Sequence, residues 1–408
     1  MESQEVKDVK KDKTDNSPLK GVFFKNRMLT AGPTPVPDYV LSAMSSGVLY
    51  HRGAEFGAIM QQCREKLKKL FGTSEEVLIF SGTGTLAMEG AVQNFFNPGE
   101  EVICVNGGKF GERWLQQAKV YGLNAKEIFV ERGRSLDLVA LQSQLTPDTK
   151  GVLVHSSETS TGARHAIKEI GKLIKEKAPH ALLCVDGVTS VGVFGTPMDA
   201  WGIDVLVSGS QKALMLPPGL SLGAASKKAW AKCENVKNTR YYNDWRKTKK
   251  TALENTGPFT SPVTLVAGLL AVLNNFEEMG YERLYEKSWR LMKATREACK
   301  AMGLQLLVKK DEDASAACTS VLTEGLIDTK AFKKLGLTIS GGQDELKGKI
   351  IRLGHIGYMD AWDVLSQIIA LSKAFSDKGK SVNLIEGMSK FWEVLESPAD
   401  QTPDDMRI

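Results

Sequence analysis

Lys212 stands in the part of the sequence that most favours chemistry by a side chain. It follows the run VLVSGSQ and precedes ALMLPPGLSLG, and no other charged residue lies between Asp204 and Lys227. Most lysines are solvated surface charges, whereas a lysine in these apolar surroundings is expected to be buried. Burial lowers the pKa of an ammonium group, and the free amine can then form an imine or transfer a proton.

Asp186 is a second candidate, because it ends the apolar run ALLCV and is followed by the small residues of GVTS. An unpaired carboxylate is costly to bury, so an acid that emerges from a core strand is expected to have a positive or proton-bearing partner. That partner could be a helix N-terminus or a cation within the protein. It could also be the protonated pyridine nitrogen of a pyridoxal cofactor, which must stay charged to withdraw electrons from a substrate.

A glycine-rich turn, SGTGTLAMEG, follows the apolar run VLIF. Its Gly82-x-Gly84-x-x-Ala87 pattern matches a relaxed dinucleotide fingerprint, whose glycines let a phosphate approach a helix N-terminus. A dinucleotide site also needs an acidic residue at the end of the next strand, but that strand ends in Asn106 and two glycines. The turn therefore predicts binding of some phosphate group through Gly84 and Thr85, with a plain strand-to-helix turn as the alternative.

The elements that must position these residues are short apolar runs separated by helical patterns. They predict an α/β fold with a mostly parallel sheet covered on both faces. The predicted strands are VLIF (77–80), EVICV (101–105), GVLVH (151–155), ALLCVD (181–186), DVLVSGS (204–210) and LSLGAAS (220–226). Ligands bind beyond the carboxyl ends of such strands. Five of these ends carry small or reactive residues and are therefore expected to form one rim around the site.

The chain is longer than a single core usually supports, so two domains are expected. We predict a disordered tail at 1–20, an N-terminal arm and large cofactor-binding domain at 21–279, a smaller C-terminal α/β domain at 280–377 and an appended extension at 378–408. After Pro262 helical patterns cover 263–280 and 281–303, short strands are expected near 304–310, 318–325 and 348–354, and further helices over 361–375 and 384–396.

The composition favours an enzyme acting on small molecules over a nucleic-acid-binding protein, because the net charge of +5 is spread along the chain. Six cysteines without a CxxC pair, and an N-terminus without a signal peptide, predict neither a zinc site nor disulfides and favour the cytoplasm. No metal is expected. The longest apolar run, near 263–276, contains Gly268 and is shorter than the ~20 residues that a membrane helix needs, so no membrane partner is expected.

Six motifs occur in one order: SGTGT, NGGKFGER, SSETSTG, VDGVTS, SGSQKALMLPPGLS and RLGHIGYMD. Together they resemble the class V aminotransferases, in particular the alanine-glyoxylate and serine-pyruvate (serine-glyoxylate) group. LTAGPTPVP and YHRGAEF resemble the N-terminal region of that group, and the similarity covers about residues 28–375. The resemblance implies the fold-type I architecture, pyridoxal 5′-phosphate (PLP) as cofactor, and a homodimer with active sites at the subunit interface.

The resemblance also implies roles for individual residues. Lys212 would hold PLP as a Schiff base and then carry the proton between the substrate Cα and the cofactor, while Asp186 would pair with the pyridine nitrogen. Arg352, in KIIRLG, would bind the substrate carboxylate through its two-pronged guanidinium. The alternative is that Arg352 is an exposed charge on a strand and binds no substrate. Further cofactor contacts would come from Phe110 and Val188 on the two ring faces, Thr159 near the phenolic oxygen, and Gly84, Thr85, Gln211 and a second subunit's Thr260 at the phosphate.

Two features depart from the pattern of the alanine-glyoxylate enzymes. Those enzymes have a phosphate-contacting tyrosine three residues before the equivalent of Thr260, where this chain has Gly257. Part of the phosphate site is therefore altered or supplied elsewhere. His355 and the His51–Arg52 pair resemble a prokaryotic branch whose substrates are less uniform.

The implied reaction is transamination, in which a small L-amino acid, serine or alanine, gives its amino group to glyoxylate or pyruvate. A cysteine desulfurase or lyase of the same fold is an alternative, because Cys318 in ASAACTSVL superficially resembles a mobile nucleophilic cysteine. That branch has histidine directly before the lysine, whereas this chain has Gln211. A catalytically silent interaction protein is the third possibility, and the presence of Lys212, Asp186 and Arg352 together argues against it.

Overall fold

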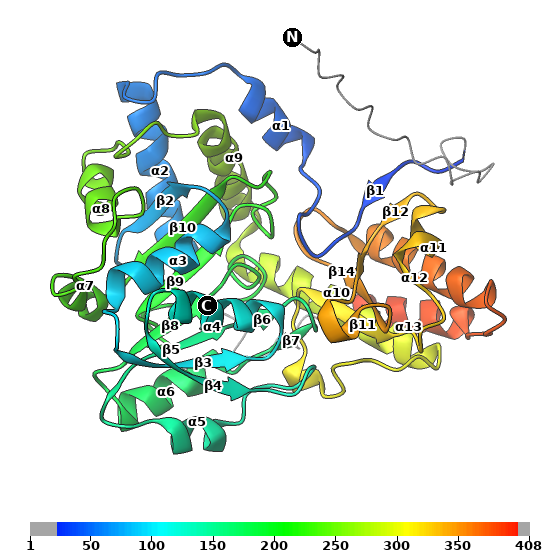
Figure 1. Ribbon diagram of the computed structural model, residues 1–408. Coiled ribbons are helices and arrows are strands. Elements are labelled where there is room, and N and C mark those ends of the chain that lie inside the picture. The colour runs from blue at the N-terminus through cyan, green and yellow to red at the C-terminus, as the bar shows by residue number, and fades with distance from the viewer. Residues whose placement is uncertain (1–22, 399–408) are drawn as a thin grey trace, which may run out of the picture.

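The computed structural model describes residues 23–398. The predicted tail at 1–20 and the last ten residues of the predicted extension lie outside the described residues. Figure 1 shows a larger body that contains strands β2–β10 and a smaller body that contains strands β11–β14. Among the described residues, no helix is both long and apolar enough to cross a membrane.

Seven strands form the central sheet, in the order β2-β10-β9-β8-β5-β3-β4. They are β2 (Val77–Ser81), β3 (Glu101–Asn106), β4 (Asn124–Phe129), β5 (Thr149–His155), β8 (Leu182–Asp186), β9 (Val205–Gly209) and β10 (Leu220–Ala225). Only β10 is antiparallel to its neighbours, β2 and β9. The prediction of a mostly parallel α/β sheet is confirmed, and the carboxyl ends of β2, β3, β5, β8 and β9 lie along one edge.

Alternate residues of the strands enter two cores, because successive side chains of a strand point to opposite faces of the sheet. Val152 and Val154 of β5 lie in a core with helices α2, α5, α6 and α9, whereas Leu153 lies in a core with α3, α4, α7 and α8. These helices are α2 (Ala54–Phe71), α3 (Gly84–Phe95), α4 (Lys109–Val120), α5 (Leu138–Gln144), α6 (Ile167–Lys177), α7 (Lys227–Cys233), α8 (Trp245–Leu253) and α9 (Val263–Met279).

The smaller body is built on a three-stranded sheet in the order β11-β14-β13. Its elements are β11 (Cys318–Leu322), α11 (Thr329–Lys333), β13 (Ser340–Gly341), β14 (Ile350–Gly354), α12 (Ala361–Ser376) and α13 (Leu384–Glu396). Helix α10 (Tyr281–Ala301) contributes Tyr285 to the large core and Leu291 to the small one. The domain boundary near residue 280 therefore falls on a helix shared by both cores, and it stays a prediction.

One expected strand of the smaller body is not formed as predicted. The stretch 304–310 makes only an isolated bridge between Leu306 and Val321. A separate contact joins the two bodies near the N-terminus, where β1 (Arg27–Met28) pairs in parallel with β12 (Leu337–Thr338) of the smaller body. The chain then runs to α1 (Asp38–Ser45), which packs on α9 in the larger body (Figure 1).

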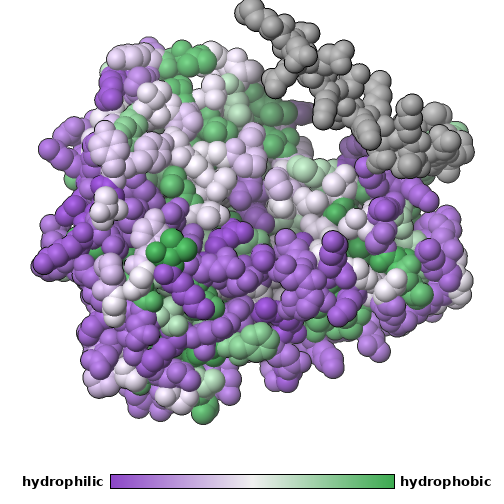
Figure 2. All heavy atoms as spheres, in the orientation of Figure 1, coloured by the Kyte–Doolittle hydropathy of each residue, from purple (hydrophilic) through white to green (hydrophobic). Residues whose placement is uncertain are grey.

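The surface is mainly hydrophilic on the face shown in Figure 2, where hydrophobic residues lie in small groups among polar ones. Several large hydrophobic side chains are nevertheless exposed, and two of them, Tyr241 and Tyr242, lie in the segment that leads into α8. Both rings lie against Phe259 in the 257–262 loop.

Candidate active site

Lys212 lies in the turn between β9 and β10, at the edge where five strands end. Its side chain is buried, and Nζ donates a hydrogen bond to the carbonyl of Ala31 at 3.0 Å. Burial lowers the pKa of the Lys212 ammonium to about 8. The amine is therefore partly unprotonated near neutral pH, as an imine-forming lysine requires.

The N-terminal segment closes directly over this lysine. Thr34 Oγ1 donates to the carbonyl of Lys212 at 2.8 Å, and the Thr34 N–H donates to that of Gln211. A Cβ on Gly32 would lie 2.3 Å from Lys212 Nζ, and Gly32 has a φ of +131°. Only glycine suits this position, so the segment's backbone forms part of the wall around the amine.

Asp186 ends β8 and is buried. It lines the same cavity as Lys212. Its Oδ1 accepts a hydrogen bond from the Val188 N–H at 2.8 Å. Burial raises the pKa of this carboxyl to about 6. A buried acid of this kind suits a partner that carries a proton, and a pyridinium nitrogen is such a partner.

The turn that is predicted to bind a phosphate forms the start of α3. Thr83 precedes the helix without capping it through its side chain, so the first N–H groups of α3 have no side-chain acceptor from this residue. Gln211 lies in the same cavity, and its Oε1 is buried without a hydrogen-bond partner among the described residues. A Cβ on Gly84 would lie 2.6 Å from Val188 Cγ2, so the close approach of α3 to the strand ends requires glycine.

A single cavity of about 220 Å³ is lined by most of the predicted cofactor residues. Seven of them line it: Gly84, Thr85, Phe110, Asp186, Val188, Gln211 and Lys212. Phe110 lies at the start of α4, and the Lys212 ammonium is 5.9 Å from the centre of its ring. This lining, with an aromatic ring and a few convergent polar groups, suits a small aromatic cofactor.

Thr159 and Arg352 lie together next to this cavity. Thr159 Oγ1 is 2.8 Å from Oγ1 of Thr189, which lines the cavity. Arg352 is buried on β14, where its Nη1 donates to the Thr159 carbonyl at 2.6 Å and its Nε donates to the Gly341 carbonyl at 2.9 Å. Its Nη2 has no hydrogen-bond partner among residues 23–398. Burial lowers the pKa of the guanidinium, and the arrangement leaves one end of it available for an anion.

Thr260 is the one predicted cofactor residue that neither lines this cavity nor contacts a residue that lines it. Together with Gly257, Phe259 and Tyr242 it lines a different cavity, bounded by α2, β2 and α8. The expectation that Thr260 serves a second subunit's site stays a prediction.

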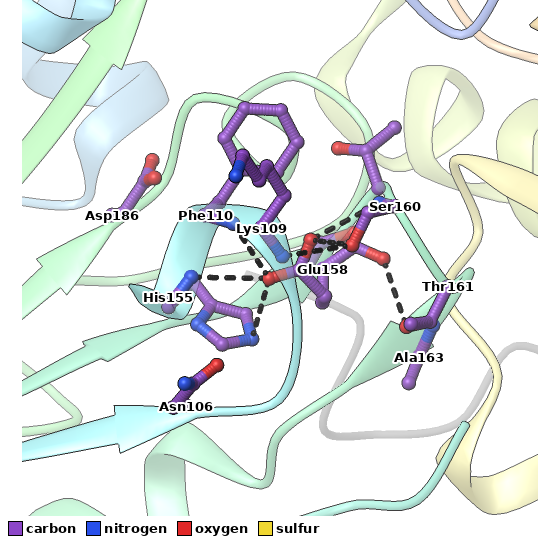
Figure 3. Close-up of polar contacts among 12 residues, drawn as sticks. Asn106, Lys109, Phe110, His155, Glu158, Ser160, Thr161, Ala163 and Asp186 are labelled. Atoms are coloured by element: carbon purple, nitrogen blue, oxygen red, sulfur yellow. Dashed lines mark hydrogen bonds and ion pairs between the residues drawn. The ribbon is translucent and has the colours of Figure 1, made fainter. Parts of the chain in front are cut away.

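Glu158 is a site residue that the sequence analysis did not single out. Figure 3 shows it at the centre of a buried polar network below Phe110. Its Oε2 accepts hydrogen bonds from the Phe110 and Gly111 N–H groups, both at 3.1 Å, and its Oε1 accepts from the Ser160 N–H at 3.1 Å and the Ser160 hydroxyl at 2.5 Å. His155 Nε2 lies 3.4 Å from Oε2. Glu158 therefore fixes the start of the helix that carries the aromatic ring.

His155 and His165 complete this network as neutral groups. Their Nε2 atoms are 3.0 Å apart, and His165 Nδ1 accepts a hydrogen bond from the Leu136 N–H. Burial lowers the pKa of His155 to about 3 and lowers that of His165 well below its usual value. The charge that faces α4 from this network is therefore that of a carboxylate and not of an imidazolium.

Comparison with known proteins assigns the chain to a family. The family model described as "Aminotransferase class-V" matches residues 28–338, which is more than half of the chain. The chain belongs to the class V aminotransferases. The family resemblance found in the sequence is thereby confirmed, and with it the PLP-dependent transaminase activity and the cofactor.

Individual relatives of this class V aminotransferase differ in name. It is 39% identical over 363 residues to the "Soluble hydrogenase 42 kDa subunit" of Anabaena cylindrica, with 87% of this chain and 94% of that protein covered. It is 31% identical over 376 residues to the "Serine--glyoxylate aminotransferase" of Arabidopsis thaliana, with 90% and 94% covered. Among solved structures, pyridoxamine-pyruvate aminotransferase from Mesorhizobium loti is similar, with a TM-score of 0.87, 28% identity, and 91% and 97% covered. The fold-type I architecture is thereby confirmed.

The residues of the cavity are suited to PLP. The buried Lys212 amine can bind its aldehyde, and the Asp186 carboxyl can accept from its ring nitrogen. Gln211 lines the same cavity as the N-terminus of α3, where a phosphate is favoured, and its amide N–H groups can donate to such an anion.

Proposed function

We propose that this class V aminotransferase transfers the amino group of a small L-amino acid, serine or alanine, to glyoxylate or pyruvate. The observation that carries the proposal is the pairing, across one cavity, of a buried lysine whose pKa is lowered with a buried aspartate whose pKa is raised. The choice of substrates is supported by the likeness to a serine-glyoxylate enzyme and by the free Nη2 end of the Arg352 guanidinium next to the site.

The residues have separate tasks in this reaction. When bound, PLP supplies the electron-withdrawing ring that makes loss of the Cα proton possible. Lys212 Nζ takes up that proton and later returns it, because its lowered pKa leaves a basic amine at neutral pH. Asp186 keeps a proton on the ring nitrogen through a charge-assisted hydrogen bond.

The substrate is oriented by groups around the amine. Arg352 binds the substrate carboxylate through Nη2, while its other donors are held by the Thr159 and Gly341 carbonyls. Phe110 and Val188 would lie against the two faces of the cofactor ring. The burial of Lys212 and Asp186 limits the access of water, which would otherwise compete with the amine for the proton.

Cysteine desulfurase chemistry is less well supported by the surroundings of Cys318. This residue begins β11, is buried, and its Sγ donates to the Thr159 carbonyl at 3.5 Å. Burial raises the pKa of the thiol to about 11. A nucleophilic cysteine needs a thiolate and access to substrate, and the surroundings of Cys318 favour neither.

We also propose the domain division near residue 280, a homodimer, and a cytoplasmic location. All six cysteines are buried and unpaired, which is the usual state in a reducing compartment.

The test is a panel of amino donors scored by the absorbance change of the bound cofactor. Serine and alanine are expected to convert it, and glyoxylate or pyruvate to restore it. Lys212→Ala is the control, and it should give no response and no pyridoxyl-peptide after borohydride reduction and peptide mapping. A wild-type chain that releases sulfide from L-cysteine, but does not respond to serine or alanine, would overturn the proposal.

A further inference from the structure

Arg113 lines the cofactor cavity, and none of the tasks described above uses it. It lies on α4, three residues after Phe110, so both side chains leave the same face of the helix. Its guanidinium carbon lies 5.0 Å from the centre of the Phe110 ring, and its Nη1 donates to Thr85 Oγ1 at 2.9 Å. The side chain is thereby held between the predicted ring-stacking residue and the predicted phosphate-binding turn.

The charge of the cofactor phosphate has few partners in this cavity. A phosphate monoester carries about −1.5 to −2 charges at neutral pH. Arg113 and Lys212 are the only cationic side chains among the described residues that line the cavity. Lys212 is committed to the aldehyde end, and Gly257 stands where related enzymes have a tyrosine at the phosphate. Arg113 is therefore the side chain that can balance this charge.

The contact with Thr85 places Arg113 at the correct end of the cavity. Thr85 is in the first turn of α3, whose N–H groups favour an anion. Because Thr85 Oγ1 accepts from Arg113, its own hydroxyl hydrogen stays available for a phosphate oxygen. Within residues 23–398, Nη1 is the one guanidinium nitrogen of Arg113 that donates a hydrogen bond. The other N–H groups of Arg113 can therefore donate to the phosphate.

The second guanidinium near the site has a different position. Arg352 is held by the Thr159 and Gly341 carbonyls, on the side of the cavity formed by the smaller body. Each arginine thus lies beside a different predicted anion, Arg352 beside the substrate carboxylate and Arg113 beside the phosphate.

We propose that Arg113 binds the phosphate of PLP, held in place by Thr85 and by the face of Phe110. Arg113 then supplies in this chain part of what the tyrosine supplies in the alanine-glyoxylate enzymes. The proposal depends on the cofactor and not on the choice of substrates, so it can fail while the proposed reaction stands.

The test compares the affinity of apoprotein for PLP with its affinity for pyridoxal, which has the aldehyde and the ring but no phosphate. In Arg113→Gln the dissociation constant for PLP is expected to rise about 10- to 100-fold, as for loss of a hydrogen bond to a charged group. The dissociation constant for pyridoxal should stay unchanged. Both are measured by titration of the absorbance of the Lys212 adduct, and Arg113→Lys should recover part of the loss.

Lys119→Gln is the matched control, since it removes an exposed positive charge from the same helix away from the cavity. It should leave both dissociation constants unchanged. An equal loss of affinity for PLP and pyridoxal in Arg113→Gln would assign Arg113 a packing role and overturn the proposal. Unchanged affinity for PLP would overturn it as well.

Discussion

At the scale of single residues, burial acts in opposite directions on the two central side chains. It lowers the pKa of Lys212 and raises that of Asp186, because in both cases it disfavours the charged form. The protein thus holds an amine that can react and a carboxyl that needs a proton-bearing partner. In the proposed site, cofactor binding would use both, since the amine would become covalently bound and the carboxyl would gain a hydrogen-bond donor.

The lowered pKa of Lys212 predicts the pH dependence of cofactor binding. The rate at which apoprotein reacts with PLP should rise with pH through a midpoint of about 8 and become level above it, because only the free amine attacks the aldehyde. An ordinary lysine would give a rate that keeps rising to about pH 10.5. Stopped-flow absorbance at a series of pH values measures this, and Lys212→Ala should give no fast phase. A midpoint near 10.5 would contradict the burial of this amine.

Sequence alone could identify some of these residues and not others. Lys212 and Asp186 stand out because their apolar neighbours in the chain are also their neighbours in space. Glu158 and Arg113 act on elements far from them in sequence, Glu158 on the start of α4 and Arg113 on Thr85. The lack of other charges in SSETSTG is the only signal that could have indicated a buried role for Glu158.

At the scale of elements, α4 begins without a local cap. Gly108 precedes it and provides no side chain, so its first N–H groups need an acceptor from elsewhere. Glu158 provides it from the loop after β5, and its negative charge also suits the positive end of the helix dipole. The loop after β5 and the start of α4, which carries the cavity residue Phe110, are thereby held in a fixed relation.

Glu158→Gln should therefore lower the stability of the protein, because the start of α4 loses its hydrogen-bond acceptor. The amide has a single acceptor oxygen, so it cannot satisfy the Phe110 and Gly111 N–H groups together with Ser160, and buried donors are left unpaired. We expect the free energy of unfolding to fall by about 1–3 kcal/mol, measured by urea denaturation of apoprotein.

Glu112→Gln is the control for this change, because Glu112 lies on the same helix and pairs with the partly exposed Lys109. A pair of this kind contributes about 0–1 kcal/mol, so the effect should be smaller. Equal losses in the two variants would refute the anchoring role of Glu158.

The strands were predictable where they are buried on both sides. The six apolar runs match β2, β3, β5, β8, β9 and β10 to within a few residues. β4 was not predicted, because NAKEIF is the partly exposed edge strand of the sheet and lacks a continuous apolar run. The stretch 304–310 shows the converse, since it packs Leu304 and Leu306 into the small core without a regular partner strand.

At the scale of the whole molecule, one chain does not contain every residue expected at the site. Thr260 lies in a separate cavity, beside a surface with exposed aromatic side chains. Tyr241 and Tyr242 are 76% and 48% exposed, and the Tyr242 ring stacks on Phe259 at 4.9 Å. Exposed aromatic groups of this kind are typical of protein interfaces, which supports the proposed homodimer with shared sites.

Subunit mixing tests this arrangement directly. Lys212→Ala removes the amine of a chain's own cavity, and Thr260→Ala removes the side chain that we expect to reach the partner's cavity. In a dimer with one chain of each kind, the cavity that keeps Lys212 also receives an intact Thr260 from its partner. Equal co-expression should therefore restore about a quarter of all sites to wild-type PLP affinity, since half of the dimers are mixed and half of their sites are intact.

The measurement is PLP titration of the variants, purified separately and after co-expression. The control is co-expression of Thr260→Ala with a chain that carries both Lys212→Ala and Thr260→Ala, because neither chain can then supply an intact Thr260 to its partner. A monomeric mass in solution, or mixed dimers whose Lys212 sites bind PLP no better than Thr260→Ala alone, would place Thr260 outside the partner's site.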